Sequence, residues 1–318
     1  MQFSNHNQKE LENLARRLKL NNISEALHFP KYFEVETIRA CNAMCNMCPV
    51  WRLRDRGSIM SDFLFSKMTN EMKNYSDWIE RVCLSRNGEP LLDPKLIQRI
   101  KMLKQAGIKE VSFSTNASLL DEEKSNALIQ AGLDDLRFSI DGTTKETFEK
   151  VRKGLDFDKV VENCLRFIKL RDKLNTNLKI HVRMVSQEQN KHEEEDFKKF
   201  WTSQVSKNDF VTSKPMHSWG AQLENYDETE EENEKYSSVP CISPFGTMIV
   251  HFNGKVPLCG CDFDNKVLLG DLNNSTMKEI WISEANKKIR DIHASGNRNS
   301  LPLCKGCNIW DEEIKKVY

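Results

Sequence analysis

The chain has 318 residues, with 47 basic and 47 acidic side chains, so its formal net charge is zero. A balanced charge gives no overall attraction to a phosphate backbone or an anionic membrane, which argues against a nucleic-acid or membrane partner. No stretch approaches the roughly 20 apolar residues of a membrane span, and residues 1–10 lack the apolar core of a secretion signal. We therefore predict a cytoplasmic protein of two domains, since one domain usually takes about 150 residues.

Residues 1–29 are polar and place Leu11, Leu14 and Leu18 at helical spacing, which predicts an N-terminal helix and linker. From residue 30 to 220, short runs rich in β-branched residues alternate with longer runs of helical periodicity. The predicted strands are 33–38, 81–85, 110–115, 136–140, 178–185 and 209–213. The predicted helices are 62–75, 94–107, 121–132, 157–174 and 193–203. This alternation predicts an α/β fold, a partial (β/α)6 barrel similar to a TIM barrel.

The segment 221–235 is rich in acidic residues and is predicted to be a solvated linker. Residues 236–318 form a predicted small second domain. A hairpin is expected over 247–259, because Asn253-Gly254 is a strong hairpin turn between two apolar runs. A helix is expected over 275–293.

The ten cysteines make up about 3% of the chain, far below the 8–10% typical of a disulfide-built scaffold. In the cytoplasm, clustered cysteines indicate metal binding or catalysis instead. They fall into a first group at 41, 45 and 48 and a second group at 241, 259, 261, 304 and 307. Cys83 and Cys164 lie singly in apolar segments and are predicted to be buried.

Cys41, Cys45 and Cys48 form a C-x3-C-x2-C motif in the loop after the first predicted strand. Loops at the carboxyl ends of parallel strands carry the active site in such folds. Three thiolates without a local fourth ligand disfavour a structural zinc site, which usually has four. The motif resembles that of the radical S-adenosylmethionine (SAM) superfamily, in which three cysteines hold a [4Fe–4S] cluster and SAM chelates the open iron.

That resemblance implies that the cluster passes one electron to SAM, and that a 5′-deoxyadenosyl radical then abstracts a substrate hydrogen atom. A one-electron reductant such as flavodoxin or ferredoxin is an implied partner. The residues that the resemblance places around SAM are Gly88, Glu89, Asn116, Ser139, Asp141 and Arg183. Gly88 and Glu89 match the motif that binds the SAM amino group, and Arg183 is a possible partner of its carboxylate. Alternatively, Glu89 or Asp141 caps a helix and Arg183 is a surface charge.

The second group resembles the SPASM or shorter twitch domains that are appended to radical SAM enzymes and bind auxiliary clusters. The resemblance implies one auxiliary [4Fe–4S] cluster with four thiolate ligands, which are Cys241, Cys259, Cys304 and Cys307. The alternative is a structural zinc site, because four cysteines satisfy zinc as well.

Cys261 is left over as a fifth thiol, and on a strand it would face the same side as Cys259. Some radical SAM epimerases use a cysteine to return a hydrogen atom to the substrate radical, so Cys261 is a candidate hydrogen donor. The alternatives are ligand exchange or a spare thiol. His217, in the sequence HSWG between the two predicted domains, is a candidate acid or base because its unperturbed pKa is about 6.5. A packing role beside Trp219 is the alternative.

We expect a small polar substrate, such as an aminoglycoside or an activated sugar, and epimerisation or oxidation at a C–H bond. A peptide-modifying maturase is the alternative. Such enzymes often carry a leader-binding domain, for which 29 residues before the first strand are too few. A non-catalytic iron–sulfur sensor or electron carrier is least favoured, because it would not need the loops expected to bind SAM.

Overall fold

The computed structural model describes residues 8–53, 56–220, 222 and 238–307. The chain divides into an α/β unit, Val35–Met216, and an auxiliary unit, Met1–Glu34 together with His217–Tyr318. The sequence-based division has its boundaries at 30 and 220 instead. The predicted acidic linker lies outside the described residues except for Gln222. No helix in the described part of the chain is long and apolar enough to cross a membrane.

Five parallel strands form the sheet of the α/β unit, in the order β10-β9-β7-β6-β5. Their bounds are β5 Arg81–Cys83, β6 Glu110–Thr115, β7 Asp135–Ser139, β9 Lys179–Ser186 and β10 Phe210–Pro215. Each lies within one or two residues of its predicted position. In β9, alternate side chains are buried, as expected for a strand packed on one face. The parallel α/β prediction is confirmed.

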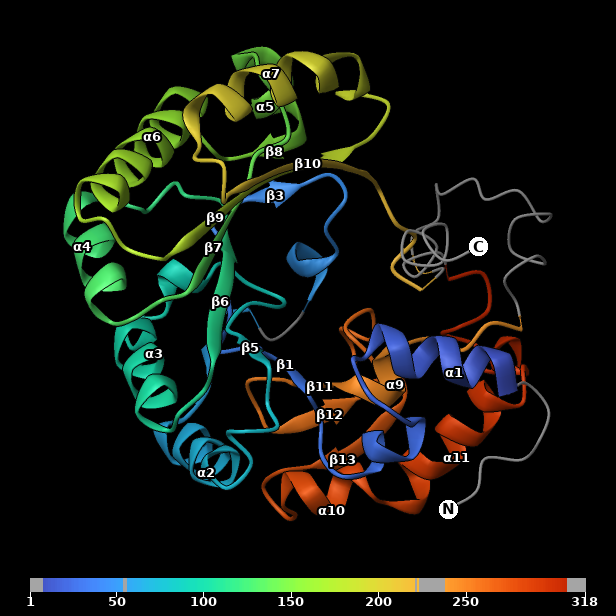
Figure 1. The fold of residues 1–318 in the computed structure, drawn as a ribbon. Coiled ribbons are helices and arrows are strands. Elements are labelled where there is room, and N and C mark those ends of the chain that lie inside the picture. The colour runs from blue at the N-terminus through green and yellow to red at the C-terminus, as the bar shows by residue number, and fades with distance from the viewer. Residues whose placement is uncertain (1–7, 54–55, 221, 223–237, 308–318) are drawn as a thin grey trace. The chain divides into compact units, whose positions relative to one another are not determined.

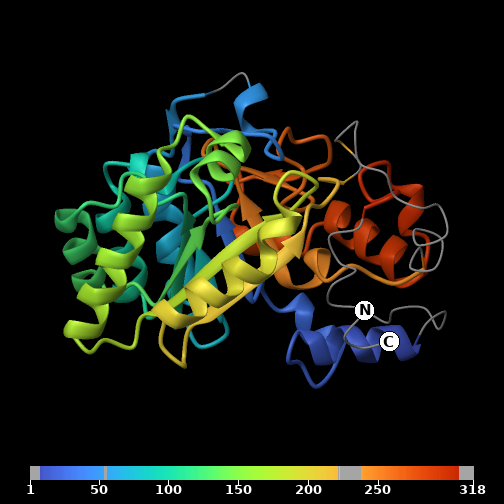
Figure 2. The ribbon, with the colours of Figure 1, turned by 90° about the horizontal axis from the view of Figure 1, so that it is seen from above.

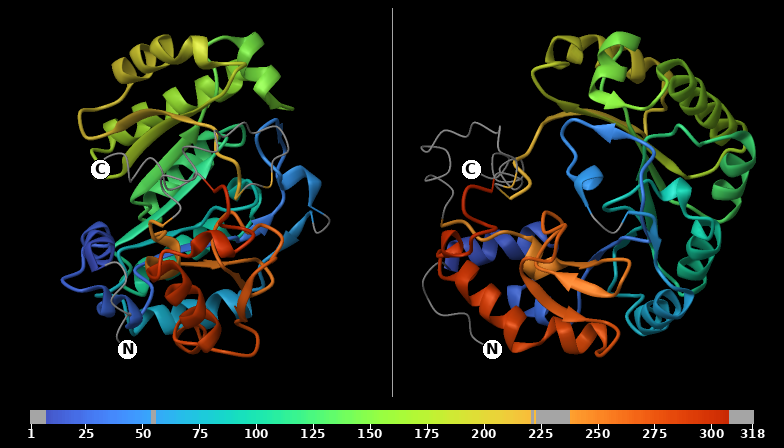
Figure 3. Two further views of the ribbon diagram at one scale, coloured as in Figure 1. Left: turned by 90° about the vertical axis from the view of Figure 1, so that its right-hand side faces the viewer. Right: turned by 180° about the vertical axis from the view of Figure 1, so that it is seen from behind.

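Figures 1 and 3 show the helices of this unit on the outer side of its strands. They are α2 Asp62–Lys73, α3 Leu96–Gln105, α4 Glu122–Gln130, α5 Lys145–Val151, α6 Phe157–Lys173 and α7 Glu194–Gln204. Side-chain oxygens of Ser61, Asp121 and Asp156 cap the first turns of α2, α4 and α6. The short helix α5 has no counterpart in the prediction. Cys83 and Cys164 are buried, as predicted.

Short pairings hold the loops of the α/β unit in place. β2 (Ile38–Arg39) pairs with β4 (Ser58–Ile59), and β3 (Met44–Cys45) pairs with β8 (Arg152–Lys153), both antiparallel. The 3-10 turns are η2 Val50–Arg52, η3 Pro90–Leu92 and η4 Lys191–Glu193. The chain segment between α5 and α6 is thus tied to the loop that carries the first cysteines.

The auxiliary unit combines the N-terminal residues with the C-terminal third of the chain. Its helices include α1 Gln8–Arg17, α9 Ser243–Gly246, α10 Met277–Trp281 and α11 Glu284–Ala294, with 3-10 turns η1 Ile23–Leu27 and η5 Arg298–Ser300. Its strands include β11 Thr247–Val250, β12 Lys255–Pro257 and β13 Leu268–Asp271, and β1 (Tyr32–Val35) ends at the unit boundary. The blue helix α1 and the red helix α11 both belong to this unit (Figure 2). Leu11, Leu14 and Leu18 are buried, as helical spacing predicted.

Two predictions for the auxiliary unit need correction. The helix expected over 275–293 is divided into α10 and α11, because Ser283 adopts an extended conformation and caps α11 through the backbone N–H of Asn286. The turn at Asn253-Gly254 is present, with Gly254 at φ +85°. However, β12 pairs with β13 rather than forming a ladder with β11, which neighbours β1 in strand order.

Candidate cofactor-binding sites

The loop of the first cysteine group lies between β2 and η2. Figure 1 shows it, in blue around β3, on the side of the strands opposite the helices. Cys45 is buried, whereas Cys41 and Cys48 are half-buried. Burial, with a smaller contribution from the neighbouring thiols, raises the pKa of the Cys41 thiol to about 11 and that of Cys48 to about 12. The three sulfurs are therefore close enough to interact, and a bound cation would favour their thiolate forms.

Arg152 reaches this cysteine group from the strand β8. Because Cys45 and Arg152 are partners in the β3–β8 register, Arg152 Nη1 lies 3.8 Å from Cys45 Sγ. Its Nη2 lies 2.7 Å from Asp141 Oδ2, and both side chains are buried. Burial lowers the pKa of Arg152, but Asp141 and Cys45 raise it more, so the net shift is upward. A permanent positive charge thus stands beside the central cysteine.

Gly88 allows the loop after β5 to approach the cysteine loop. A Cβ there would overlap the carbonyl oxygen of Ile38 and lie 2.9 Å from that of Ala40. The next backbone N–H, that of Glu89, donates to Ala40 O at 2.7 Å. Only glycine fits this contact without displacing the residue next to Cys41.

The Glu89 carboxylate is buried among backbone and side-chain donors. It accepts hydrogen bonds from the Thr115 hydroxyl at 2.7 Å, the Asn116 N–H at 2.8 Å and the Leu91 N–H at 3.1 Å. Burial raises its pKa despite these bonds. Glu89 caps η3, the alternative noted above, and it joins the loops that follow β5 and β6.

Asn116 connects the loop after β6 to the cysteine loop. Its Nδ2 donates to Asn42 Oδ1 at 2.9 Å, and Asn42 in turn donates to the Ser118 hydroxyl at 2.8 Å. Ala117, between them, has the left-handed φ of +58°. This network places the side chain of Asn116 next to the residue that follows Cys41.

The remaining predicted SAM residues lie at the ends of β7 and β9. Ser139 and Arg183 are neighbours in the parallel register, and both are half-buried. Asp141, fully buried, accepts a hydrogen bond from the Val185 N–H at 2.7 Å in addition to its Arg152 contact. The α/β unit therefore brings the first cysteine group together with the loops at 88–89, 116 and 141. Sequence reasoning missed Arg152 and Asn42, because only the β3–β8 pairing and the folded loops bring them to the site.

The second cysteine group gathers within the auxiliary unit. Burial, with smaller contributions from the nearby Cys307 and Cys259, raises the pKa of Cys241 to about 12. Burial also raises the pKa of Cys304, with contributions from the same neighbours and Cys241. Cys261 is buried, and its thiol contacts those of Cys259 and Cys307, which raise its pKa. The five thiols of the second group thus form one cluster.

The sequence predicts that Cys259 and Cys261 lie on a strand, but in the structure both lie in a turn after β12. In this turn the Asp262 N–H donates to Cys259 O at 3.1 Å. The strand argument for a shared side is therefore wrong. Their thiols nevertheless contact each other because the turn folds back.

His293, which sequence reasoning missed, lies among these cysteines at the end of α11. Its Nδ1 accepts a hydrogen bond from the Cys241 backbone N–H at 3.2 Å. Its Nε2 lies 3.7 Å from Cys304 Sγ. Burial, with a smaller contribution from the charge of Arg298, lowers the pKa of His293 to about 3. The ring is consequently neutral.

The HSWG segment, residues 217–220, belongs to the auxiliary unit. The rings of His217 and Trp219 are 4.7 Å apart, and the Trp219 N–H donates to His217 Nδ1 at 3.2 Å. Gln222 Nε2 donates to both Trp219 O, at 2.6 Å, and Cys261 O, at 2.7 Å. A Cβ at Gly220 would lie 3.5 Å from Cys261 Cβ. The segment wraps the turn that carries Cys261.

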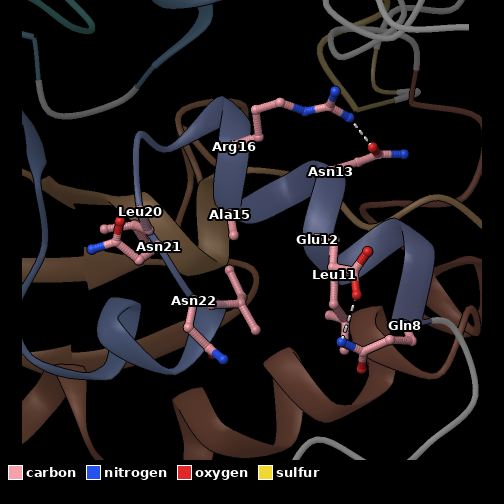
Figure 4. Close-up of a pocket in the computed structure, with 10 residues that line it drawn as sticks. Gln8, Leu11, Glu12, Asn13, Ala15, Arg16, Leu20, Asn21 and Asn22 are labelled. Atoms are coloured by element: carbon pink, nitrogen blue, oxygen red, sulfur yellow. Dashed lines mark hydrogen bonds between the residues drawn. The ribbon is translucent and has the colours of Figure 1, made fainter.

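A cavity of about 610 Å³ lies elsewhere in the auxiliary unit, between α1 and η1 (Figure 4). Its lining includes Leu11, Asn13, Arg16 and Asn22. The described residues that line it fall between 8 and 23, and none of them is a cysteine.

Comparison with known families accounts for both cysteine groups. The family model of the radical SAM superfamily matches residues 35–200, and that of the SPASM iron-sulfur cluster-binding domain matches residues 241–308. Since the first match covers more than half of the chain, the protein belongs to the radical SAM superfamily. It is a radical SAM enzyme with a SPASM-type iron–sulfur domain, and its cofactors are [4Fe–4S] clusters and SAM.

Curated relatives match only part of the chain. A UPF0026 protein of Helicobacter pylori (strain ATCC 700392 / 26695) is 30% identical over 139 residues, which are 41% of this chain and 44% of the relative. A probable GTP 3′,8-cyclase of Saccharolobus islandicus (strain L.S.2.15 / Lassen #1) is 34% identical over 123 residues, 38% of each chain. The chain thus spans less than half the length of these relatives.

Solved structures match at low identity and show the fold alone. BtrN in complex with AdoMet and 2-DOIA is 18% identical with a TM-score of 0.60, covering 88% of this chain and 93% of BtrN. The protein anSMEcpe with AdoMet and Cp18Cys peptide is 18% identical with a TM-score of 0.63, covering 87% and 88%. Streptococcus suis SuiB bound to precursor peptide SuiA is 13% identical with a TM-score of 0.59, covering 96% and 76%.

The donor atoms present fit these cofactors. Each site offers clustered thiols, the soft ligands that iron–sulfur clusters take. Among the described residues, no three His, Cys, Asp or Glu side chains converge tightly enough for a single metal ion.

Proposed function

We propose that the protein abstracts a hydrogen atom from a C–H bond of a small polar substrate, such as an aminoglycoside or an activated sugar, giving epimerisation or oxidation. Cys41, Cys45 and Cys48 would hold the cluster that binds SAM. When bound, the cluster and SAM supply the carbon radical that takes the hydrogen atom. The observation that carries the proposal is the convergence of three buried or half-buried thiols with the loops after β5, β6 and β7.

Residues of the α/β unit hold the loops of this site in position and supply its charged groups. Arg152 would stabilise the thiolate of Cys45 through its guanidinium, while Asp141 fixes the guanidinium in place. Glu89 would hold the Gly88 loop against the cysteine loop. Ser139, Asn116 and Arg183 would present donors to SAM, with Arg183 facing the SAM carboxylate as its ionic partner.

Two arguments support a small substrate, and one supports the alternative. The BtrN structure, which contains 2-DOIA, matches over nearly its full length. The balanced charge of the chain also needs no polyionic substrate. A peptide-modifying maturase is the second candidate, because anSMEcpe with a bound peptide matches equally well.

A cytoplasmic location and a flavodoxin or ferredoxin reductant belong to the same proposal.

The auxiliary cluster would be held by four cysteines, Cys241, Cys259, Cys304 and Cys307. Cys261 would determine whether the reaction is an epimerisation or an oxidation. In an epimerisation, the Cys261 S–H would give its hydrogen atom to the substrate radical. The resulting sulfur radical would regain an electron from the reductant and a proton from solvent. In an oxidation, the substrate radical would instead lose a proton and pass one electron to an acceptor, for which an oxidised cluster at the four auxiliary thiolates is the candidate. His217 would serve as the acid or base that handles that proton.

The test is a substrate panel incubated anaerobically with enzyme, reductant and SAM in D₂O, followed by mass spectrometry. The panel contains aminoglycosides, nucleotide sugars and candidate peptides. An epimerised sugar or aminoglycoside gains one deuterium, and Cys261→Ala abolishes its formation. A product two hydrogens lighter, formed equally by Cys261→Ala, indicates oxidation and removes the donor role of Cys261. Modification of the peptides alone contradicts the small-substrate proposal.

A further inference from the structure

The ring of His293 connects two ligands of the proposed auxiliary cluster. We propose that His293 is a positioning residue that raises the reduction potential of this cluster through an N–H···S hydrogen bond to Cys304. The inference rests on the proposed cluster at Cys241, Cys259, Cys304 and Cys307.

The fold fixes the tautomer of the ring. The backbone N–H of Cys241 points at Nδ1 from 3.2 Å, so Nδ1 must be the acceptor. In a neutral imidazole the other nitrogen then carries the proton. Nε2 faces Cys304 Sγ at 3.7 Å and is therefore the donor to that sulfur.

The position of the ring makes this contact specific. His293 is 1% exposed, so water does not compete for either nitrogen. It lies in the last turn of α11, which is rigidly held because Arg290, one turn earlier, donates to Pro244 O and Trp281 O. One side chain thus spans from the start of α9, next to Cys241, to the CKGC segment that contains Cys304.

A hydrogen bond to a ligating sulfur changes the energy of the two cluster charge states unequally. The reduced cluster carries one more negative charge, and a donor at the sulfur stabilises it more than the oxidised form. The bond therefore raises the potential, and its removal makes the cluster harder to reduce. A purely structural histidine would alter cluster loading or protein stability without this directed shift.

The experiment uses the full-length chain with Cys41, Cys45 and Cys48 replaced by alanine, so that only the auxiliary cluster remains. Iron analysis confirms the cluster, and an EPR-monitored redox titration gives its midpoint potential. His293→Phe keeps the ring volume but removes both hydrogen bonds, and His293→Gln restores a donor and an acceptor. His251→Phe is the matched control, because His251 is equally buried but contacts Asn265.

We expect His293→Phe to shift the potential to a more negative value, His293→Gln to recover part of it, and His251→Phe to leave it unchanged. Full iron content with an unchanged potential in His293→Phe would overturn the role of His293 alone. Absence of iron from the parent triple variant would overturn the auxiliary cluster as well.

A second measurement detects the hydrogen bond in protein that retains His293. In protein labelled with ¹⁵N-histidine, pulsed EPR of the reduced auxiliary cluster should detect a weakly coupled histidine nitrogen. His293→Gln should lose this coupling. Absence of the histidine coupling from protein that retains His293 would contradict the hydrogen bond.

Discussion

Arg152 and Cys45 are 107 residues apart in the chain, yet the guanidinium lies beside the sulfur because β8 pairs with β3. A buried charge of this kind is tolerated only with a partner, and Asp141 supplies it. The pair therefore has two roles at the residue scale. It closes the loop after β7 over the cysteine loop, and it supplies positive charge to a thiolate.

Replacement of Arg152 by methionine should destabilise the protein by about 3 kcal/mol, because the Asp141 carboxylate would stay buried without its partner. Lys153→Met, at the exposed neighbouring position, is the control. Chemical denaturation measures the free energy of unfolding. Equal stabilities of the two variants would show that the pair contributes nothing net.

Gly88→Ala should disrupt the cysteine loop. The new Cβ would overlap Ile38 O, and relief of that contact must move either the loop after β5 or the backbone before Cys41. We expect a loss of about 1–3 kcal/mol of stability from overpacking. We also expect reduced iron at the first cysteine group, measured after reconstitution. Wild-type iron content in this variant would contradict the close approach.

At the scale of elements, Glu193 ties α7 to the loop before α5. It accepts hydrogen bonds from the Thr143 N–H and hydroxyl and from the Thr144 hydroxyl. Burial raises the pKa of Glu193, but these bonds lower it more, to about 2. The stabilisation is therefore present above the unfolded pKa and is lost as the pH falls toward 2.

Glu193→Gln should reduce the free energy of unfolding by roughly 2–3 kcal/mol at about pH 6. The deficit should be smaller at about pH 3, because the Glu193 carboxyl is then protonated in the unfolded chain while it stays largely ionised in the folded protein. Denaturant titrations of both proteins at the two pH values measure the difference. A deficit that does not depend on pH would mean that the carboxylate charge is not involved.

The helix α11, which carries His293, is stabilised by an N-cap at its first turn. Ser283 caps it by accepting a hydrogen bond from the Asn286 N–H at 3.3 Å. Ser283→Ala should cost about 1 kcal/mol, whereas Ser24→Ala, at an exposed position in η1, should cost little. Thermal unfolding distinguishes the two, and equal melting temperatures would argue against the cap.

The elements show where sequence reasoning works and where it stops. Strands such as β6 and helices such as α6 were predictable because their apolar residues repeat with one period along the chain. The break at Ser283 was not, because apolar residues continue on both sides of it. His293 and Arg152 have no motif, and their roles come from contacts with residues distant in sequence. The three-cysteine loop could be predicted because its ligands are local.

At the scale of the whole molecule, each unit assembles one group of thiols. The α/β unit places its group at the carboxyl ends of parallel strands, where such folds bind ligands. The auxiliary unit places its group between α9, the turn after β12 and the CKGC segment. Membership in the radical SAM superfamily assigns the chemistry of these cofactors.

Reductive cleavage of SAM tests the central claim most directly. Wild-type protein, reconstituted anaerobically and supplied with reductant, should release 5′-deoxyadenosine and contain two clusters. Cys41→Ala should release none and keep the auxiliary cluster, while Cys83→Ala, at a buried cysteine outside both groups, should resemble wild type. Release of 5′-deoxyadenosine by Cys41→Ala at the wild-type rate would contradict the assignment of the SAM-binding cluster to Cys41, Cys45 and Cys48.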